Sequence, residues 1–587
     1  MKVILALTLV APVVWGDSAL YLSRARNLAQ FGWPVIDNFC GPDYPPLYSI
    51  LISPAFLIRA VPEVSYHLCL AINALVGTSI VFPAYLIHER LTGKAVPSLA
   101  VASIVAFLPA SFVFSQSIMA ENLMLPLVMW LSLAALHYPE TRRGAAFAVG
   151  ALASASILTK SLALGLLPGL LVLGLVTLFE ARDDPKRKKR AFVSFGAMFG
   201  GLFVPWALWQ GWDWLAQAHR AVPASLEGSY PFNWYKGALI SAITDLNGTM
   251  IFLRVLIGQL VYLFFSTFGL AAVAVVGILL FLIHRPKRSS RAPWAAFLVF
   301  SVGILFVGSV HCASYYTMSP ERYSFFGRYA DSAAVPLVVL GAAFLQQTST
   351  MRKRILMIAL PVGVLAACAI PYPGWIWLHR VGIFYLRPIK DLSSYRAMAL
   401  VLAILPLMCA FGFWRRSWRV AAVLVLGVGV TFSSALAFSA VHAASRDFYE
   451  HHPIAGFLRN HFTTGGDQLL VAASEFKRQG CFHGQHWMLL YQTGSAFSLF
   501  SRVEDLERFP RGHDVYFATT EALPNQRAVA SEGNLFLFRV RAQRLINILE
   551  EKNPDSRERT DRVRSAKAVC PSGAGDEAGR AHGEKRK

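Results

Sequence analysis

Charge is scarce in this sequence. Only 15% of its 587 residues are charged, whereas 55% are hydrophobic, and the mean hydropathy is +0.47. A water-soluble protein of this length needs a more highly charged surface. The composition therefore argues against an ordinary soluble protein and indicates a membrane protein.

The sequence also lacks an ordered cysteine pattern. Its seven cysteines show neither the spacing of a metal site nor that of a disulfide framework, and they stand at positions 40, 69, 312, 368, 409, 481 and 570. No internal repeat is found. Zinc modules, disulfide scaffolds and repeat architectures are therefore not indicated.

Long apolar runs dominate the chain as far as residue 441. Backbone polar groups in hydrocarbon must bond within their own segment, so these runs predict helices. The predicted fold class is an all-α polytopic membrane protein of about thirteen transmembrane helices. The predicted spans are 2–16, 66–88, 96–114, 121–138, 145–159, 161–180, 191–210, 262–284, 293–311, 331–347, 355–371, 397–414 and 419–441.

Two interpretations of residues 1–16 stay open, a signal peptide and an uncleaved first span. No small-x-small cleavage site precedes Asp17, and further spans follow, which favours the uncleaved span. Its apolar run is shorter than the ~20 residues that a span needs. We therefore expect the true start to lie somewhat upstream.

Basic residues concentrate in alternate loops. By the positive-inside rule, loops rich in lysine and arginine are cytoplasmic. The basic loops hold Arg90 and Lys94; Arg142 and Arg143; Arg182, Lys186, Arg187, Lys188, Lys189 and Arg190; Arg285, Lys287, Arg288 and Arg291; Arg352, Lys353 and Arg354; and Arg415, Arg416 and Arg419.

The alternation has no exception. It predicts a bacterial inner-membrane protein with a cytoplasmic N-terminus and an extracytoplasmic C-terminus, and with 17–65 and 211–261 among the outer loops. Much of the net charge of +21 then lies in the cytoplasmic loops that orient the protein in the membrane, so a nucleic-acid partner is not expected.

The composition changes after the last predicted span. Alternating stretches at Gln468–Ala473 and Asn534–Val540 predict strands, and turn signals surround them. We predict a transmembrane domain at 1–441 and a small extracytoplasmic α/β domain at 442–550. Residues 551–587 are charged and Gly-rich, and a disordered tail is expected there.

The first predicted outer loop carries a distinctive pattern. Asp17 stands where the first span ends, and short interfacial helices are predicted at 18–31 and 47–60. Between them lies Asp43-Tyr44-Pro45-Pro46-Leu47-Tyr48. Taken alone, Asp17 fits a helix N-cap, and the Pro-Pro element fits a rigid turn.

Together these elements resemble the GT-C superfamily of glycosyltransferases. The resemblance is greatest to the protein mannosyltransferase-like and aminoarabinose transferase-like branch, and it covers roughly residues 1–180. It implies that Asp17 is catalytic, and Asp43 and Glu121 are further acidic candidates for the catalytic role. It also implies that Glu121, at the outer edge of the fourth span, lies near Asp17. If a divalent metal is required, Asp17 and Glu121 would share it.

The same resemblance assigns the basic residues. Lys160, in the turn Leu158-Thr159-Lys160-Ser161, resembles the Thr-Lys-Pro turn of the family. Arg322 and Arg328 precede the tenth span in an Arg-Tyr element. The resemblance implies that these three cations bind a lipid phosphate. Without it, Lys160 fits a snorkelling lysine, Glu121 fits a helix-start carboxylate, and the arginines fit interfacial anchors.

The resulting hypothesis is an inverting glycosyltransferase. The protein would lie in the lipid bilayer and move a sugar from a polyprenyl-phosphate donor to an extracytoplasmic lipid, glycan or protein. Such transfer needs a base for the acceptor hydroxyl and cations for the leaving phosphate. The alternatives are a transporter or flippase of a lipid-linked glycan, and a non-enzymatic assembly scaffold. Transporters usually show repeats or midplane charges, which are not found here.

Overall fold

The structure is a computed structural model, and it divides into two compact units. One comprises Met1–Asp37 with Gly41–Glu450, and the other comprises Asn38–Cys40 with His451–Lys587. The structure describes residues 1–9, 18–32, 44–58, 62–138, 143–217, 239–284, 290–318, 324–346, 355, 376–378, 419–450, 468–472, 498–500, 514–519, 523, 526–532, 535–541, 544–545 and 547–548.

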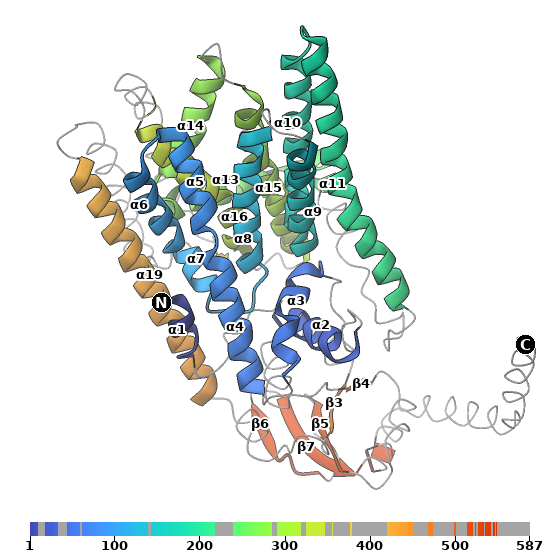
Figure 1. The fold of residues 1–587 in the computed structure, drawn as a ribbon. Coiled ribbons are helices and arrows are strands. Elements are labelled where there is room, and N and C mark those ends of the chain that lie inside the picture. The colour runs from blue at the N-terminus through green and yellow to red at the C-terminus, as the bar shows by residue number, and fades with distance from the viewer. Residues whose placement is uncertain are drawn as a thin grey trace, which may run out of the picture. The chain divides into compact units, whose positions relative to one another are not determined.

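The first unit is a helical bundle (Figure 1). Its described helices are α1 (Lys2–Ala6), α2 (Ser18–Phe31), α3 (Leu47–Ile52), the 3-10 helix η1 (Ser53–Phe56), α4 (Pro62–Thr78), α5 (Val81–Thr92), α6 (Ala95–Ala106), α7 (Pro109–Phe114), α8 (Glu121–His137), α9 (Arg143–Thr159), the 3-10 helix η3 (Ser161–Leu166), α10 (Leu167–Glu180), α11 (Pro185–Gln217), α13 (Leu246–Ser266), α14 (Leu270–Ile283), α15 (Ala292–Met318), α16 (Arg328–Leu345) and α19 (Arg419–Glu450). Strand β1 (Ser324–Phe326) pairs in parallel with β2 (Ile376–Leu378).

The chain is a multi-pass membrane protein. Within the described residues, the helices long and apolar enough to cross a bilayer are Val64–Thr92, Ser161–Glu180, Pro185–Leu215, Leu246–Ser266, Ala292–Ala313 and Arg328–Leu345. Shorter apolar helices lie where spans were expected at 96–114, 121–138 and 145–159. The total of thirteen stays a prediction, because 397–414 and all of 355–371 except Ile355 lie outside the described residues.

The first predicted span, 2–16, is described only as far as Leu9. Its short helix α1 packs beside other helices through polar contacts. The buried Nζ of Lys2 donates to the carbonyl and the hydroxyl of Ser111, each at 3.0 Å. The carbonyl of Leu9 lies 2.9 Å from Nε2 of His67. These contacts fix α1 against α7 and α4.

Three predicted spans, 66–88, 96–114 and 262–284, are each divided between two helices in the structure, which are α4 and α5, α6 and α7, and α13 and α14. Residues 262–284 were expected to form one helix, but α13 and α14 meet at a break where Phe268 has φ 51° and Gly269 has φ 79°. Two left-handed residues in succession cannot continue a right-handed helix. Residues 246–261, expected in an outer loop, are helical, and the Asp245 carboxylate caps α13 by accepting from the Gly248 N–H at 2.8 Å. Arg254 and Gln259 had lowered the hydropathy of this stretch.

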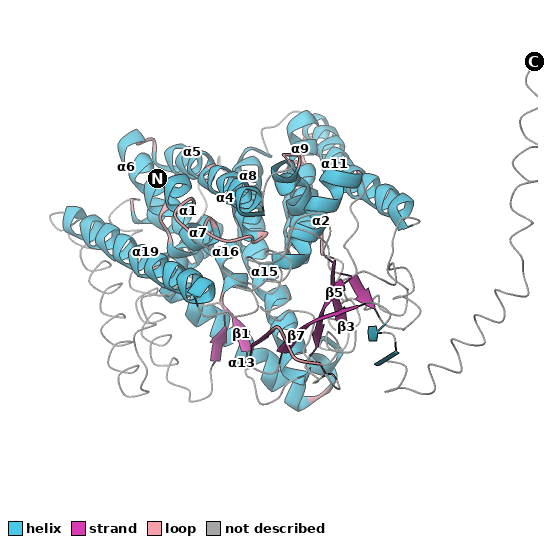
Figure 2. Ribbon diagram, turned by 90° about the horizontal axis from the view of Figure 1, so that it is seen from below, coloured by secondary structure: helices cyan, strands magenta, loops and turns pink. Residues whose placement is uncertain are grey.

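The core of the bundle is built around α16. Helix α16 packs against α8, α14 and α15, and the view along the bundle shows it among the other helices (Figure 2). In the most apolar 18-residue stretch of α16, 94% of the residues are buried, whereas in the corresponding stretch of α11 only 17% are buried. Helix α11 exposes large apolar side chains such as Phe203, Trp206 and Leu208, as expected of a lipid-facing helix.

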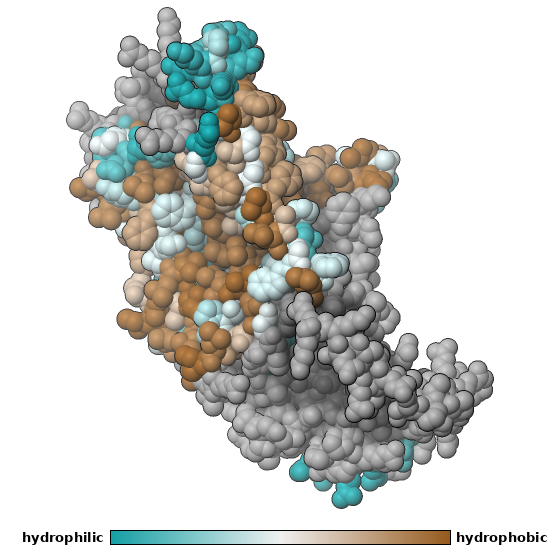
Figure 3. Space-filling model, turned by 45° about the vertical axis from the view of Figure 1, so that its right-hand side comes forward, coloured by the Kyte–Doolittle hydropathy of each residue, from teal (hydrophilic) through white to brown (hydrophobic). Residues whose placement is uncertain are grey.

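On the face shown in Figure 3, the surface of the bundle is mainly hydrophobic and ends in a hydrophilic cap. The turn after α10 and the first residues of α11 expose a run of charged residues, Arg182–Asp184 and Lys186–Arg190. In the predicted topology this charged turn is cytoplasmic.

Two glycines, Gly303 and Gly327, allow neighbouring segments to pack closely beside the candidate site. A Cβ on Gly303 of α15 would lie 1.9 Å from the Gly165 carbonyl oxygen, so η3 packs directly on α15. A Cβ on Gly327 would lie 2.3 Å from the Tyr262 ring. These contacts fix the segments that carry Lys160 and Arg328.

The second unit contains a five-stranded sheet of order β4-β3-β5-β7-β6. Strand β3 (Gln468–Ala472) pairs in parallel with β4 (Ser498–Phe500) and β5 (Asp514–Thr519), whereas β7 (Leu535–Arg541) pairs antiparallel with β5 and with β6 (Ala530–Glu532). The two predicted strands are thus confirmed. The α/β character of this unit stays a prediction, and the expected disordered tail at 551–587 lies outside the described residues.

Candidate functional site

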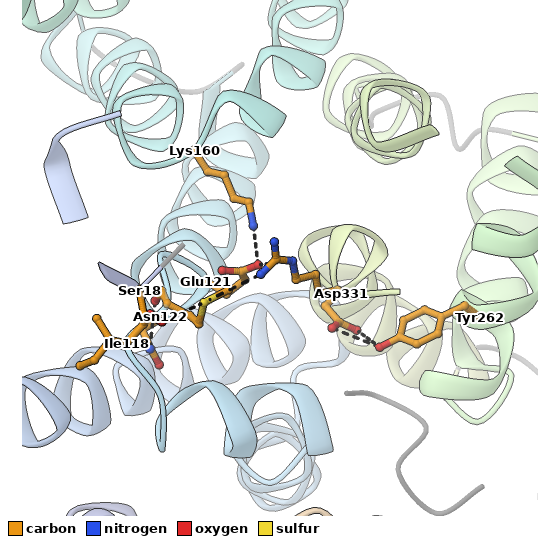
Figure 4. Close-up of polar contacts among 9 residues, drawn as sticks. Ser18, Ile118, Glu121, Asn122, Lys160, Tyr262 and Asp331 are labelled. Atoms are coloured by element: carbon orange, nitrogen blue, oxygen red, sulfur yellow. Dashed lines mark hydrogen bonds and ion pairs between the residues drawn. The ribbon is translucent and has the colours of Figure 1, made fainter. Parts of the chain in front are cut away.

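Charged and aromatic side chains meet where several helices of the bundle begin. Glu121 is the first residue of α8, Lys160 immediately precedes η3, and Arg328 is the first residue of α16. In the predicted topology all three positions lie at the outer edge of the membrane. The fold therefore brings together three of the six residues that the sequence had singled out (Figure 4).

The centre of the cluster is a buried carboxylate between two cations. The Lys160 ammonium donates to Oε1 of Glu121, and Nε of Arg328 lies 3.7 Å from that same oxygen. The three side chains are 8%, 5% and 1% exposed for Lys160, Arg328 and Glu121 respectively. Buried charges persist when they are paired, and this cluster follows that rule.

The Tyr329 ring lies beside both cations. The Lys160 ammonium is 4.9 Å from its centroid and the Arg328 guanidinium carbon is 5.3 Å from it, distances typical of cation–π contacts. The His311 ring packs edge-on against Tyr329 at 4.9 Å. The aromatic ring thus limits where the two cations can lie.

A second carboxylate, which the sequence reasoning missed, lies next to the cluster. Asp331 is buried in the first turn of α16, and both of its oxygens accept from the Tyr262 hydroxyl, at 3.0 and 3.2 Å. Its spacing of three from Arg328 places both on neighbouring positions of one helix face. An acidic residue in an otherwise apolar helix was the signal that could have found it.

The turn before Glu121 is held by an asparagine. The Asn122 side-chain amide donates to the carbonyls of Phe114, Ser117 and Met119, at 2.7, 3.0 and 3.0 Å. The Asn73 amide also donates to the Ser117 carbonyl, at 2.9 Å. These bonds satisfy carbonyls at a helix end and fix the direction in which α8 starts.

The first outer loop packs on that same turn. Its predicted helices are confirmed as α2 and as α3 followed by η1. The Ser18 hydroxyl donates to the Ile118 carbonyl at 2.7 Å, and the Tyr48 hydroxyl donates to Oδ1 of Asn73 at 3.0 Å. Arg24 donates to the Tyr44 carbonyl. The loop with the GT-C-like pattern therefore lies against the segment that positions Glu121.

The other three predicted site residues cannot be placed. Asp17, Asp43 and Arg322 lie outside the described residues. Ser18, the next residue after Asp17, is described and contacts the turn before α8. The predicted roles of all six residues therefore stay proposals.

The divalent metal that Asp17 and Glu121 were proposed to share stays a prediction, because Asp17 lies outside the described residues. Among the described residues no group of three or more histidine, cysteine, aspartate or glutamate side chains is arranged to hold a metal. Glu121, one of the two residues proposed to share a metal, has one oxygen in contact with both Lys160 and Arg328. Adding a divalent cation beside two fixed cations is electrostatically unfavourable.

Comparison with known proteins gives a structural likeness and no sequence match. No family model and no curated protein matches the chain. The structure is similar to that of ArnT from Cupriavidus metallidurans in the apo state, with a TM-score of 0.50 and 13% identity, over 92% of this chain and 95% of that one. The resemblance to GT-C glycosyltransferases is thus confirmed at the level of the fold.

Other solved structures are also similar to this chain. ArnT bound to undecaprenyl phosphate aligns with a TM-score of 0.49 and 13% identity over 92% of this chain and 96% of that one. The arabinosyltransferase EmbB from Mycobacterium smegmatis aligns with a TM-score of 0.39 and 13% identity, over 77% of this chain and 40% of that one.

Proposed function

We propose that this chain is a membrane glycosyltransferase that moves a sugar from a polyprenyl-phosphate donor to an extracytoplasmic acceptor, with inversion. The acceptor is a lipid, a glycan or a protein. The observation that carries the proposal is the buried pair of cations, Lys160 and Arg328, at the start of bundle helices in a GT-C-like fold. ArnT, which shares that fold, has been crystallised with undecaprenyl phosphate.

In this proposal the cations bind the phosphate of the donor. Lys160 and Arg328 would donate to the phosphate oxygens, and Arg322 would be a further donor. As the bond between the anomeric carbon and the phosphate oxygen breaks, negative charge develops on the phosphate. Fixed cations in a site from which water is excluded stabilise such charge strongly.

An acid of the first outer loop would serve as the base. The acceptor hydroxyl oxygen attacks the anomeric carbon, and its proton passes to the Asp17 carboxylate. The polyprenyl phosphate leaves from the opposite face of the sugar, so one displacement inverts the configuration.

Ser18 supports the role of Asp17 as the base because Ser18 contacts the turn that leads into Glu121. Asp43 is the second candidate of the loop. Glu121 is the weaker candidate because its Oε1 faces both cations.

The test is transfer by the purified chain in proteoliposomes. A panel of undecaprenyl-phosphate-linked hexoses and pentoses, each labelled in the sugar, would be offered with extracted membrane lipids and proteins as acceptors. Asp17→Asn keeps a good N-cap for α2 while it removes the base. We expect the rate to fall by about 10²–10⁴-fold.

Asp245→Asn is the matched control, because it makes the same change at a helix cap where asparagine also caps well. Its transfer rate should equal that of the wild type. An Asp17→Asn protein with the wild-type rate would remove Asp17 from the mechanism. Movement of lipid-linked glycan across the membrane without any covalent product would replace the enzyme with a transporter.

A further inference from the structure

The cation pair of the candidate site already holds an anion that belongs to the chain. A single oxygen, Oε1 of Glu121, faces both the Lys160 ammonium and Nε of Arg328. Two cations converging on one oxygen is the arrangement expected for a phosphate oxygen. The Glu121 carboxylate is therefore placed where it competes with any phosphate that binds these cations.

The second oxygen of Glu121 is held less firmly. Among the described residues, Oε2 is buried and has no hydrogen-bond partner. A buried acceptor without a donor is destabilising, typically by about 1–3 kcal/mol. Within the described part of the chain, only one of the two Glu121 oxygens is therefore held by the neighbouring cations.

The charges in the cluster decide which phosphates it favours. Lys160 and Arg328 carry two positive charges, and the Glu121 carboxylate that faces both of them carries one negative charge. A phosphodiester carries one negative charge, whereas a phosphomonoester carries nearly two above its second pKa of about 6. At the same position, the Glu121 charge repels a dianionic monoester about twice as strongly as it repels a monoanionic diester.

We infer that Glu121 is an internal counter-ion that lets the site distinguish the phosphodiester donor from the phosphomonoester product. This inference rests on the proposed function and deepens it. Glu121 lowers the affinity for the dianionic spent carrier more than that for the monoanionic donor. The spent carrier is therefore released instead of blocking the two cations.

The experiment measures binding in nanodiscs at pH 8, where the monoester is a dianion. The probes are undecaprenyl phosphate and its methyl diester, each titrated against wild type, Glu121→Gln and Glu180→Gln. Glutamine is close in size to glutamate but carries no charge. We expect Glu121→Gln to shift the ratio of the two affinities toward the monoester by about tenfold or more, because charge interactions are strong in a buried site.

Glu180→Gln is the matched control. Glu180 ends α10, at the far end of the helical segment that starts beside Lys160, and it accepts from Ser290 and from the Arg291 N–H. Its substitution should leave the affinity ratio unchanged. In the transfer assay, added undecaprenyl phosphate should inhibit Glu121→Gln at lower concentration than it inhibits wild type.

The possible results distinguish failure of the counter-ion role from failure of the proposed glycosyltransferase function. If wild type binds both probes and Glu121→Gln leaves their ratio unchanged, the counter-ion role is wrong and the glycosyltransferase proposal stands. If the ion pair of Glu121 were purely structural, Glu121→Gln would give that result, and the only effect of the substitution would be a lower melting temperature. If wild type binds neither probe, the proposed function fails and the counter-ion role fails with it.

Discussion

At the scale of single residues, the buried charges need an explanation beyond stability. Removing an ion pair from water has a desolvation cost that its mutual attraction often only just offsets. Lys160, Glu121 and Arg328 are nevertheless almost completely buried in a membrane protein. A functional use of these charges accounts for their retention better than a stabilising one.

Lys160 provides a direct test of that explanation. Replacing it alone leaves the Glu121 charge less well compensated, and breaking a buried pair typically costs about 3–5 kcal/mol. The informative variant is therefore Lys160→Gln combined with Glu121→Gln, which removes the pair as a whole. We expect it to fold and to transfer sugar about 10²–10³-fold more slowly than Glu121→Gln alone.

The measurement is the initial rate of transfer, together with thermal unfolding in detergent. Lys94→Gln serves as the control, because Lys94 is exposed in a predicted cytoplasmic loop. Its rate should match that of wild type. A folded double variant as fast as Glu121→Gln alone would show that Lys160 does not assist the leaving phosphate.

The site residues differ in how visible they were in the sequence. Glu121, Lys160 and Arg328 stand in short motifs at the ends of apolar runs, so a family resemblance could identify them. Tyr262 and Asp331 form their contact across 69 positions of sequence. No local pattern encodes such a pair, because it exists only when α13 packs beside α16.

At the scale of elements, close helix packing places the charged residues. Gly165 and Gly303 allow η3 to approach α15 to backbone contact. Any side chain there must push the two segments apart, and Lys160 lies five positions before Gly165. The geometry of the cation pair therefore depends on two residues that have no polar side chain.

Gly303→Ala should expose this dependence. The added methyl group would overlap the Gly165 carbonyl, and overpacking of this kind typically costs about 1–3 kcal/mol. We expect a lower melting temperature in detergent and a lower transfer rate, because the start of η3 shifts relative to α16.

Gly196→Ala is the matched control for that variant. Gly196 lies on α11, and a Cβ there meets nothing within 4 Å. Alanine in a helix interior is favoured over glycine by roughly 0.5–1 kcal/mol. Gly196→Ala should therefore be as stable as wild type or more stable, and fully active. Equal melting temperatures for the two variants would contradict the proposed close approach.

At the scale of the whole molecule, charge should orient the chain in the membrane. The turn after α10 and the start of α11 together expose six basic residues next to apolar, lipid-facing helices. The positive-inside rule places this turn in the cytoplasm and the start of α13 outside. Both positions are exposed, so both can be labelled.

Cysteine labelling of spheroplasts tests the orientation. A membrane-impermeant maleimide should label Asn247→Cys in intact spheroplasts, whereas Lys188→Cys should react only after the membrane is disrupted. Wild type, whose described cysteines Cys69 and Cys312 are buried, gives the background. Labelling of Lys188→Cys from outside would reverse the predicted topology and move the candidate site to the cytoplasm.

The sequence by itself determined the class of this protein. Apolar runs long enough to span a bilayer must form helices, and this depends on composition within each run and on no distant contact. The helices of the first outer loop followed from the same local patterns. The break at Phe268 and Gly269 could not be foreseen, because the apolar run continues through it and only the backbone conformation shows the turn.

Only the tertiary structure decided which charges meet. Glu121, Lys160 and Arg328 come from three helix starts, and their separation in sequence leaves many arrangements open. Packing of η3 on α15, and of Gly327 against the Tyr262 ring, selects one of them. Coulomb energy depends on distance and on burial, and both are properties of the packed bundle rather than of the order of residues.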